Sequence, residues 1–567
     1  MFLKAASVSW NFTEGWNKLF RTFLAPGVGL KCNPGLDKQE HFRIFAGLSL
    51  GLGFLLLLPT LWFGFGADHG MTAYGAWIWR EFGELPYVHY FEGDFPGIFL
   101  LNYFIQETLG ESVSAFRIFD LLWQSATVLL IFLVSSAVFG KPMAGFLAGM
   151  LYAVYYYGLG YWNTGERDTF LLLPCLVSFW LYFRRWPEEA GLQYSVLTGL
   201  LFGFAFLVKP VAALPGLLFA GVVFKSSRSK YLATALFALF AGLPFLAFLA
   251  WYWRLGHLEE MIQVLFVFSS RVYTNTLLLA PKDFLSGIIM TKSFALAPLM
   301  GLGIALYLIF GKSQEPTARA NGNWLLVLFA GFFMGYLVQG KYFLYQQAPV
   351  SGMMSIFAGA GWTHFLEKFK AFRSAKARLG LVMGLIILSL VIMLSEHERR
   401  KFLFASLTMR PSKGQLLNPF FQPLVQAADY VRAHTSPDDK LQVWGGDGLV
   451  NYLSRRRCPT RFAQNFPLTL AAVSPSGAEI KEELGREFLD SIQKDPPVYF
   501  LVETISHHGF GIASDKELLV QAYPELWRLV KEKYLPEYRL PFLDGFIEFY
   551  RLSPFSGSAP HSDEQIK

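Results

Sequence analysis

The hydrophobic residues of this 567-residue chain are gathered into long, nearly uncharged runs. Most have about the 17 to 25 residues that a helix needs to cross a bilayer, whereas a soluble protein would interrupt them with polar residues. The pattern predicts a polytopic α-helical membrane protein with eleven spans, at about residues 44–65, 118–139, 143–160, 169–183, 194–208, 211–224, 231–253, 285–309, 323–340, 348–366 and 378–395.

Short basic segments between the spans predict the orientation of the chain. "RRW" (184–186), "KSSRSK" (225–230) and "EKFKAFRSAKAR" (367–378) are typical of cytoplasmic loops, which are enriched in Lys and Arg. We therefore expect a cytoplasmic N-terminal segment (1–43), a membrane domain (44–395) and a C-terminal domain (396–567) on the periplasmic or extracellular side of the inner membrane.

The segments outside the membrane have secondary-structure patterns of their own. In the long first loop (66–117), "TAYGAWIWREFGEL" predicts a helix at the membrane interface. "FPGIFLLNYFIQETLG" predicts a second, half-immersed helix or, alternatively, another span, which would change the topology. In the C-terminal domain, "PLVQAADYVRAHTSPDDK" predicts a helix and a turn, whereas "LQVWGG", "PPVYFLVET" and "GFIEFYRL" predict strands. The domain is therefore expected to be a small α/β domain.

Composition agrees with this architecture and excludes some functions. Hydrophobic residues make up 53% of the chain and charged residues 16%, against about a quarter charged in soluble proteins. The net charge is +7, and the basic residues lie in short loops between the spans. The positive charge is therefore explained by the orientation of the chain in the membrane and does not indicate binding to nucleic acid. The three cysteines are not placed to pair, and no cleavable signal peptide is apparent.

Acidic residues near the ends of spans are candidates for chemistry. Asp68, followed by His69, comes directly after the first span; it could be a general base or a metal ligand, or only cap the helix that follows. Glu166 and Asp168 flank Arg167 at the mouth of another span, where the two carboxylates could face one divalent cation or simply cap a helix. His69, Glu92, Asp94 and Arg167 are further candidates for substrate binding.

Isolated cations on the same side form a second group. Lys209, Arg271 and Lys341 lie near span ends, where a charge is costly unless it has a partner. They could bind a phosphate or reach the lipid head groups. Tyr345, close to Lys341, could line a lipid or sugar groove, although interfacial aromatic belts are also common.

The order of these motifs resembles the GT-C superfamily of membrane glycosyltransferases. "DHGMTAYGAWIWREFGELPYVHYFEGDFPGIF" is similar to their first outer loop, "YWNTGERDTFLLLP" to their second acidic loop, and "GKYFLYQQAPV" to a later segment. "ADYVRAHTSPDDKLQVWG" and "RRRCPTRF" resemble their outer domain. The likeness is to bacterial relatives of dolichyl-phosphate-mannose protein mannosyltransferases and to aminoarabinose and RgtA-type transferases, and it covers nearly the whole chain.

The resemblance implies transfer of a sugar, with inversion, from a polyprenyl-phosphate donor to a lipid, glycan or protein acceptor. Asp68 would be the base, Lys209 or Arg271 would bind the donor phosphate, and Glu166 and Asp168 would position the substrates or a divalent metal ion, with no other cofactor implied. One departure is that His69 follows Asp68, whereas many family members carry two adjacent acids there.

A transporter or flippase of a lipid-linked or anionic substrate is the alternative function. Such proteins usually place charges near the middle of the membrane and often contain internal repeats. The sequence shows neither feature, so it favours the transferase.

Overall fold

The computed structural model describes residues 36–183, 191–274, 297–310, 316–368, 374–395, 397–446, 448–474, 477–506 and 514–554. Several predicted segments lie wholly or partly outside these residues. They are most of the N-terminal segment, the basic motif at 184–186, the start of the span at 285–309 and part of the basic loop at 367–378.

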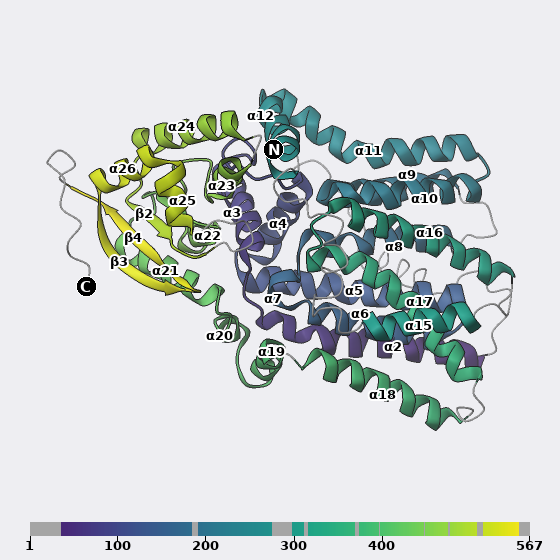
Figure 1. Ribbon diagram of the computed structural model, residues 1–567. Helices are drawn as coiled ribbons and strands as arrows, with labels where there is room; N and C mark the ends of the chain where they lie inside the picture. The colour runs from purple at the N-terminus through teal and green to yellow at the C-terminus, as the bar shows by residue number, and fades with distance from the viewer. Residues whose placement is uncertain are drawn as a thin grey trace, which may run out of the picture.

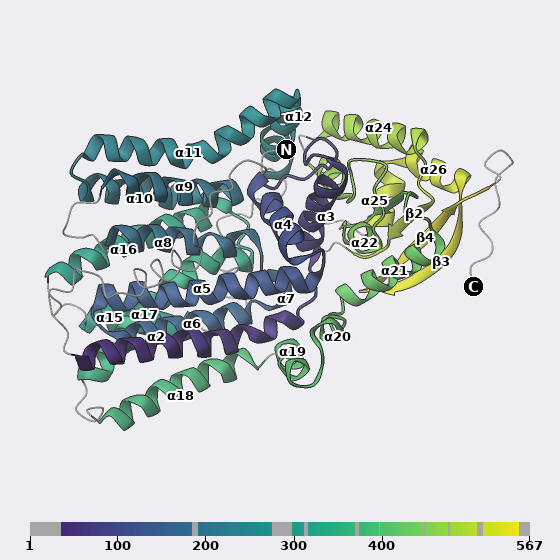
Figure 2. The same cartoon turned by 180° about the vertical axis from the view of Figure 1, so that it is seen from behind.

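Long helices packed side by side form the larger part of the molecule (Figures 1 and 2). A helix overlaps each of the eleven predicted ranges. These helices are α2 (Leu36–Leu57, continued by the 3₁₀ helix η1, Leu58–Trp62), α5 (Val113–Phe139), α6 (Pro142–Gly158), α8 (Leu172–Phe183), α9 (Leu192–Val208), α10 (Ala213–Ser226), α11 (Lys230–Leu255), α15 (Ala297–Phe310), α16 (Pro316–Gln339), α17 (Ala348–Lys368) and α18 (Ala375–Met393).

Four helical segments in the described part of the chain are long and apolar enough to cross a membrane by length and composition: 39–62, 113–139, 230–255 and 322–339. Four other apolar helices are shorter, so the number of spans stays a prediction. The helices approach closely where small residues meet, as usual in membrane bundles. A Cβ atom on Gly361 of α17 would lie only 1.7 Å from the carbonyl oxygen of Gly303 in α15.

The first loop contributes two helices at one end of the bundle. α3 (Ala67–Phe82) and α4 (Pro96–Leu109) lie between the bundle and the C-terminal region in both views (Figures 1 and 2). They correspond to the two helices that the sequence predicts there. After α11, the chain forms α12 (Leu258–Ile262) and the π-helix η4 (Gln263–Tyr273).

The C-terminal region contains a four-stranded sheet with the order β1-β2-β4-β3. β1 (Leu441–Trp444) and β2 (Tyr499–Glu503) are parallel, while β4 (Gly545–Leu552) is antiparallel to β2 and to β3 (Tyr534–Phe542). The helices of this region are α19 (His397–Thr408), α20 (Pro411–Gln415), α21 (Phe421–His434), α22 (Leu449–Ser454), α23 (Phe466–Val473), α24 (Ala478–Lys494), α25 (Asp515–Ala522) and α26 (Pro524–Lys533).

The sequence predicts three of the four strands but not β3. Pro536 and Pro541 argue against a strand, because proline cannot donate a hydrogen bond to a neighbouring strand. β3 lies at the edge of the sheet, where one side of a strand has no neighbour and proline is tolerated.

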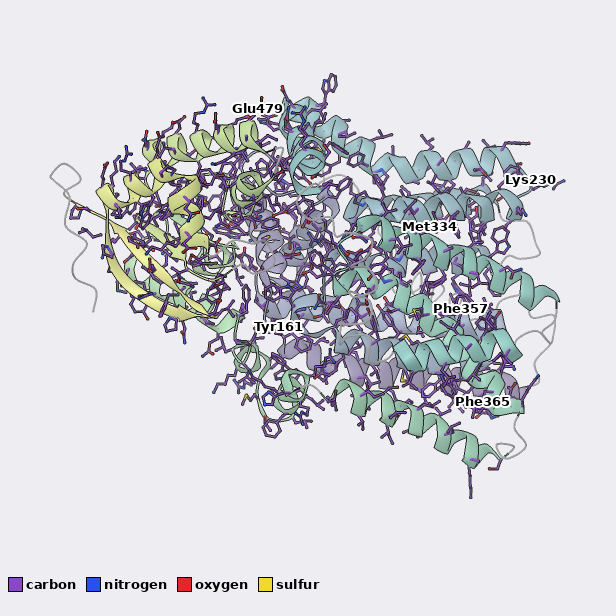
Figure 3. The ribbon with its side chains drawn as sticks, in the orientation of Figure 1. Tyr161, Lys230, Met334, Phe357, Phe365 and Glu479 are labelled. Carbon is purple, nitrogen blue, oxygen red and sulfur yellow. The ribbon has the colours of Figure 1, made fainter. Side chains whose placement is uncertain are left out.

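The C-terminal region is attached directly to the first loop. The hydroxyl of Tyr74 in α3 accepts a hydrogen bond from the backbone N–H of Cys458 at 2.9 Å, and Arg457 pairs with Glu84 at 2.8 Å. Figure 3 shows Tyr161 at this end of the bundle and Lys230 at the opposite end. The first-loop helices α3 and α4 and the end of α10 that carries the basic segment 225–230 likewise lie at opposite ends of the bundle (Figure 1), and the side of the membrane that each end faces stays a prediction.

Candidate active site between the helix bundle and the C-terminal region

Asp68 lies in the first turn of α3 and faces Arg167, which comes from the loop between α7 (Gly160–Asn163) and α8. Arg167 donates through Nη2 to Asp68 Oδ2 and through Nη1 to Asp94 Oδ1. A carboxylate is also favourable at a helix N-terminus, where free N–H groups point outward. The Asp68 side chain is 31% exposed, against 14% for Asp94, so it is the more accessible of the two acids.

His69, and not Asp68, caps α3. The backbone N–H of Gly66 donates to His69 Nδ1 at 3.0 Å, so the proton of the neutral ring is on Nε2, which lies 2.8 Å from the carbonyl oxygen of Thr164. Burial lowers the pKa of His69, and Arg117 lowers it further. Since both ring nitrogens are engaged within the protein, we leave His69 out of the proposed substrate-binding set.

The two acids beside Arg167 have different partners. Glu166 Oε1 lies 3.6 Å from His69 Nε2 and its Oε2 lies 3.6 Å from Arg167 Nη2, whereas Asp168 pairs with Lys209. Burial raises the pKa of Glu166, and Asp68 raises it further. The described residues contain no group of three or more His, Cys, Asp or Glu side chains arranged to hold a metal ion. Because Glu166 and Asp168 are bound to protein cations and a histidine, they do not fit one shared metal ion.

Lys209 follows α9 and precedes the short 3₁₀ helix η3 (Pro210–Ala212). Its ammonium group donates to Asp168 Oδ2, while Gln339, the last residue of α16, donates to Asp168 Oδ1 at 3.2 Å. Asp168 is only 1% exposed, so the pairing satisfies a charge that would be costly to bury alone.

Aromatic rings hold the cations in place. Tyr345, in the 3₁₀ helix η7 (Leu344–Gln347), lies beneath both Arg167 and Lys209, whose charged groups are 5.6 and 5.1 Å from its ring centre. Its hydroxyl accepts a bond from Arg167 Nη2 at 3.2 Å. Lys341 lies over the ring of Tyr273. Such cation–π contacts are attractive and orient the cations.

Lys341 differs from Lys209 because no carboxylate within 4.0 Å of its ammonium group is found among the described residues. Burial lowers the pKa of Lys341 to about 7, and the nearby charges of Lys209 and Arg167 act in the same direction. Its ammonium group is therefore well suited to gain an anionic partner.

Glu92 connects this cluster to the C-terminal region. Gln464, which lies just before α23, donates from Nε2 to Glu92 Oε2. Burial, and after it the charge of Asp94, raise the pKa of Glu92 to about 8, although Arg167 opposes the change. Glu92 is therefore largely protonated at neutral pH.

The structure thus gathers most of the predicted site residues into one group, but not all of them. Asp68, Asp94, Glu166, Arg167, Asp168, Lys209 and Tyr345 are linked by direct contacts, and Glu92 and Lys341 act on the group electrostatically. Arg271 is exposed on η4. Sequence reasoning missed three neighbours of the cluster, which are Tyr273, Gln339 and Gln464; they carry no charge and belong to no motif that would mark them.

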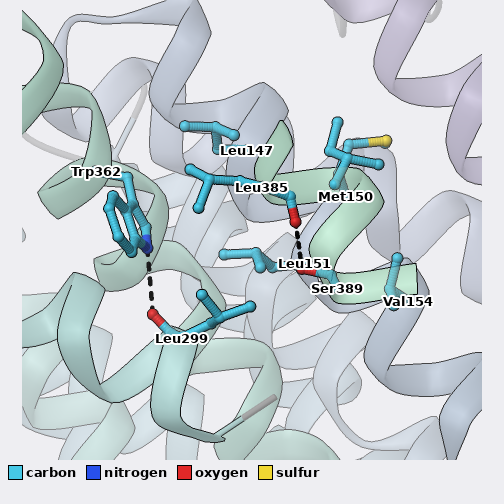
Figure 4. Close-up of a pocket in the computed structure, with 9 residues that line it drawn as sticks. Leu147, Met150, Leu151, Val154, Leu299, Trp362, Leu385 and Ser389 are labelled. Carbon is cyan, nitrogen blue, oxygen red and sulfur yellow. Dashed lines mark hydrogen bonds between the residues drawn. The ribbon is translucent and has the colours of Figure 1, made fainter. Parts of the chain in front are cut away.

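A separate pocket lies inside the helix bundle (Figure 4). Side chains of α6, α15, α17 and α18 line it: Leu147, Met150, Leu151, Val154, Leu299, Trp362, Leu385, Ile386 and Ser389. Its two polar groups are already bonded, because Ser389 donates to the carbonyl oxygen of Leu385 and Trp362 to that of Leu299. This pocket therefore offers an apolar surface and no group for chemistry.

Comparisons with known proteins bear on this arrangement. Residues 96–253 match the family model described as dolichyl-phosphate-mannose-protein mannosyltransferase. The structure is similar to that of ArnT from Cupriavidus metallidurans bound to undecaprenyl phosphate, with a TM-score of 0.58, 14% sequence identity, and coverage of 91% of this chain and 99% of that one. The resemblance to the GT-C superfamily is confirmed. No match was found among curated proteins.

Two other solved structures of the GT-C superfamily are more distant. The oligosaccharyltransferase AglB from Archaeoglobus fulgidus gives a TM-score of 0.47 at 11% identity, over 90% of this chain and 75% of that one. The arabinofuranosyltransferase AftD from Mycobacteria gives 0.46 at 12% identity, over 92% and 42%. The GT-C fold thus rests on the similarity to ArnT, while the family model covers α4, α5, α6, α8, α9, α10 and nearly all of α11.

Proposed function

We propose that this protein transfers a sugar from a polyprenyl-phosphate donor to a hydroxyl group of a lipid, glycan or protein acceptor, on the membrane face that carries the C-terminal region. The observation that carries the proposal is the joining of the partly exposed Asp68 to a cluster of cations at that end of the bundle. The GT-C fold, and the undecaprenyl phosphate bound to ArnT, support the same donor class.

Asp68 is the proposed general base. Arg167 holds Oδ2 of its carboxylate, and no hydrogen bond to Oδ1 is seen within the described residues. Oδ1 can therefore accept the proton of the acceptor hydroxyl as that oxygen attacks the anomeric carbon of the donor sugar. The bond between this carbon and the phosphate oxygen breaks, and the electron pair leaves with the phosphate. Attack opposite the leaving group inverts the anomeric carbon.

Lys341 is the proposed principal partner of the donor phosphate. Lys209 already neutralises Asp168, whereas an anion near Lys341 would compensate a charge that burial and neighbouring cations destabilise. A positive charge at the leaving phosphate stabilises the negative charge that develops there in the transition state. Lys209 and Arg167 then supply the positive field around it.

The experiment that tests this proposal uses the purified protein in lipid nanodiscs. A panel of radiolabelled sugars linked to undecaprenyl phosphate is incubated with the protein and with a bacterial envelope fraction as the source of acceptors. We expect release of undecaprenyl phosphate and transfer of label from at least one donor. In parallel, the protein is reconstituted into sealed vesicles, where movement of an intact donor across the bilayer without transfer would favour the transporter and overturn the proposal.

A further inference from the structure

Gln464 has a side-chain oxygen that the fold leaves unused. The residue is 1% exposed, and its Nε2 donates to Glu92, but its Oε1 has no hydrogen-bond partner. Buried polar atoms in native proteins are nearly always paired with protein, water or a ligand. An unpaired oxygen beside a cluster of charged residues therefore points to a bound group that donates a hydrogen bond.

The position of Gln464 is fixed on both sides. Three residues before Gln464, the carbonyl oxygen of Arg461 accepts a hydrogen bond at 2.7 Å from the backbone N–H of Phe91, the residue next to Glu92. On the other side, Asn465 donates from its backbone to Gly445 at 2.9 Å and from its side chain to Asp515 at 2.6 Å. A side chain held in this way can recognise a substrate group with little loss of conformational entropy.

Two more unpaired atoms belong to residues of the same cluster. Arg167 Nε and Gln339 Oε1 are also buried without a hydrogen-bond partner, although both residues contact the cluster carboxylates through other atoms. These two residues and Gln464 thus leave two acceptors and one donor without a partner. A sugar suits this set because each of its hydroxyl groups both donates and accepts hydrogen bonds.

We propose that Gln464 is a substrate-binding residue whose side-chain oxygen accepts a hydrogen bond from a sugar hydroxyl, while Glu92 holds its amide group. This inference rests on the proposed function and adds a residue of the C-terminal region to the active site. The neutral state of Glu92 at physiological pH supports it, because a carboxylic acid beside the hydroxyl can also donate.

The test compares Gln464→Ala with Gln415→Ala in nanodiscs. Gln415 is a matched control because it also joins the C-terminal region to the membrane part, through the carbonyl oxygen of Leu61 and the hydroxyl of Ser114, away from the cluster. The probes are undecaprenyl phosphate without sugar, the glycosylated donors that the wild type accepts, and the envelope fraction as acceptor.

We expect Gln464→Ala to bind undecaprenyl phosphate within about twofold of the wild type. Either its affinity for the glycosylated donors should fall or its apparent KM for the acceptor fraction should rise, by about three- to tenfold, as expected for the loss of one hydrogen bond. A weaker affinity for glycosylated donors would identify the donor sugar as the source of the hydroxyl. An increase in the apparent KM for the acceptor fraction alone would identify the acceptor.

Two outcomes would count against the inference, in different ways. If Gln464→Ala is folded and changes neither quantity by more than Gln415→Ala does, Gln464 does not bind sugar. If the wild type itself shows no sugar-dependent binding and no transfer, the proposed function is wrong and the inference falls with it. Gln464→Glu gives a second readout: it replaces the amide donor by a carboxylate against Glu92, so the sugar-dependent loss should be at least as large.

Discussion

Two arginines near the same end of the bundle are bonded in opposite ways. Arg117 is fully buried, and its guanidinium donates to the carbonyl oxygens of Phe63, Gly64, Tyr161 and Thr164 and to the Thr164 hydroxyl, at 2.6 to 3.3 Å. Arg167 is 12% exposed and donates to side chains, namely Asp68, Asp94 and Tyr345. Main-chain partners cannot move or titrate, so Arg117 joins two loops, whereas Arg167 arranges groups that can react.

The acids near the two arginines differ in the same way. Asp120 is fully buried, and its Oδ1 accepts hydrogen bonds from Tyr156 at 2.6 Å and from Gln124 at 3.2 Å. Asp68 is partly exposed and keeps one oxygen available. A charged cluster in a membrane protein is therefore not functional by its charge alone. Among the described residues, both acids keep one carboxylate oxygen without a hydrogen-bond partner, Oδ1 in Asp68 and Oδ2 in Asp120, so exposure is what distinguishes the two.

The largest expected effect is on catalysis at Asp68. Asp68→Asn keeps the size of the side chain and one oxygen but cannot accept the proton of the acceptor. General-base catalysis is typically worth about 10²–10⁴-fold, so the rate of transfer should fall at least a hundredfold while the protein remains monodisperse. Glu107→Gln, which changes an exposed acid of α4, is the control and should keep its activity. Near-normal transfer by Asp68→Asn would remove Asp68 from the catalytic role.

The second effect is on stability at Arg117. Arg117→Met removes the donors for four main-chain carbonyls and leaves Asp120 without its nearby cation, and breaking a buried charged network of this kind costs about 3–5 kcal/mol. We expect a large fall in the melting temperature in detergent, measured by differential scanning fluorimetry. Arg167→Met should lower transfer far more than it lowers the melting temperature. If the two variants melted alike, the distinction between the two arginines would be wrong.

The architecture could be predicted further than the site. Long uncharged runs place a helix in every predicted range, because a bilayer imposes both length and composition on a spanning helix. The three strands β1, β2 and β4 are short apolar runs between turn residues, which sequence patterns indicate directly. β3 was missed because its two prolines are acceptable only at a sheet edge, and an edge is a property of the assembled sheet.

The candidate site was predicted as a list of charges without their pairing. Asp68, Arg167 and Lys209 could be identified from their positions near the ends of spans, because a charge near the membrane is costly unless it has a partner. Which acid meets which cation depends on how distant loops come together. This information is absent from local sequence, so the sequence could not separate Lys209, which is paired with Asp168, from Lys341. Nor could it identify Gln464, which is uncharged and more than 350 residues from Glu92 along the chain.

Binding of the donor phosphate sharpens the comparison between Lys341 and Lys209. Lys341→Gln removes a cation whose contact in the structure is an aromatic ring, and a hydrogen bond to a charged group is worth about 1.5–3 kcal/mol. We therefore expect affinity for undecaprenyl phosphate to fall at least tenfold at pH 6, measured by microscale thermophoresis. Lys209→Gln should cost less, because Lys209 is already paired with Asp168. Lys413→Gln, at an exposed position in α20, is the control. A greater loss for Lys209→Gln would restore Lys209 as the main phosphate ligand.

The pH dependence of this binding follows from the same lysine. The pKa of Lys341 is lowered to about 7, so the charged form that attracts phosphate is present below pH 7 and is lost as the pH rises through this value. Affinity should fall by up to about tenfold between pH 6 and pH 8. Lys341→Arg should flatten the profile, because arginine keeps its charge throughout. Glu92, with a pKa of about 8, gains negative charge in the same pH range. The Glu92→Gln variant therefore measures how much Glu92 contributes to the loss of affinity. A profile unchanged by both variants would contradict this account.

The smallest expected effect is that of removing metal ions. A divalent cation needs carboxylates that are free to turn toward it, but Asp168 is held by Lys209 and Gln339, and Glu166 lies against His69 and Arg167. Treatment with EDTA, followed by dialysis, should therefore change the rate of transfer by less than about twofold, equivalent to about 0.4 kcal/mol.

The variants Glu166→Gln and Asp168→Asn, assayed with and without EDTA, distinguish a metal site from metal-free positioning of the substrates. If the wild type is inhibited by EDTA, recovers with Mg²⁺ or Mn²⁺, and both variants lose this response, the two acids must leave their present partners to bind a metal. The separation of these acids from one another in the structure would then describe a resting arrangement and not the one in which the sugar is transferred.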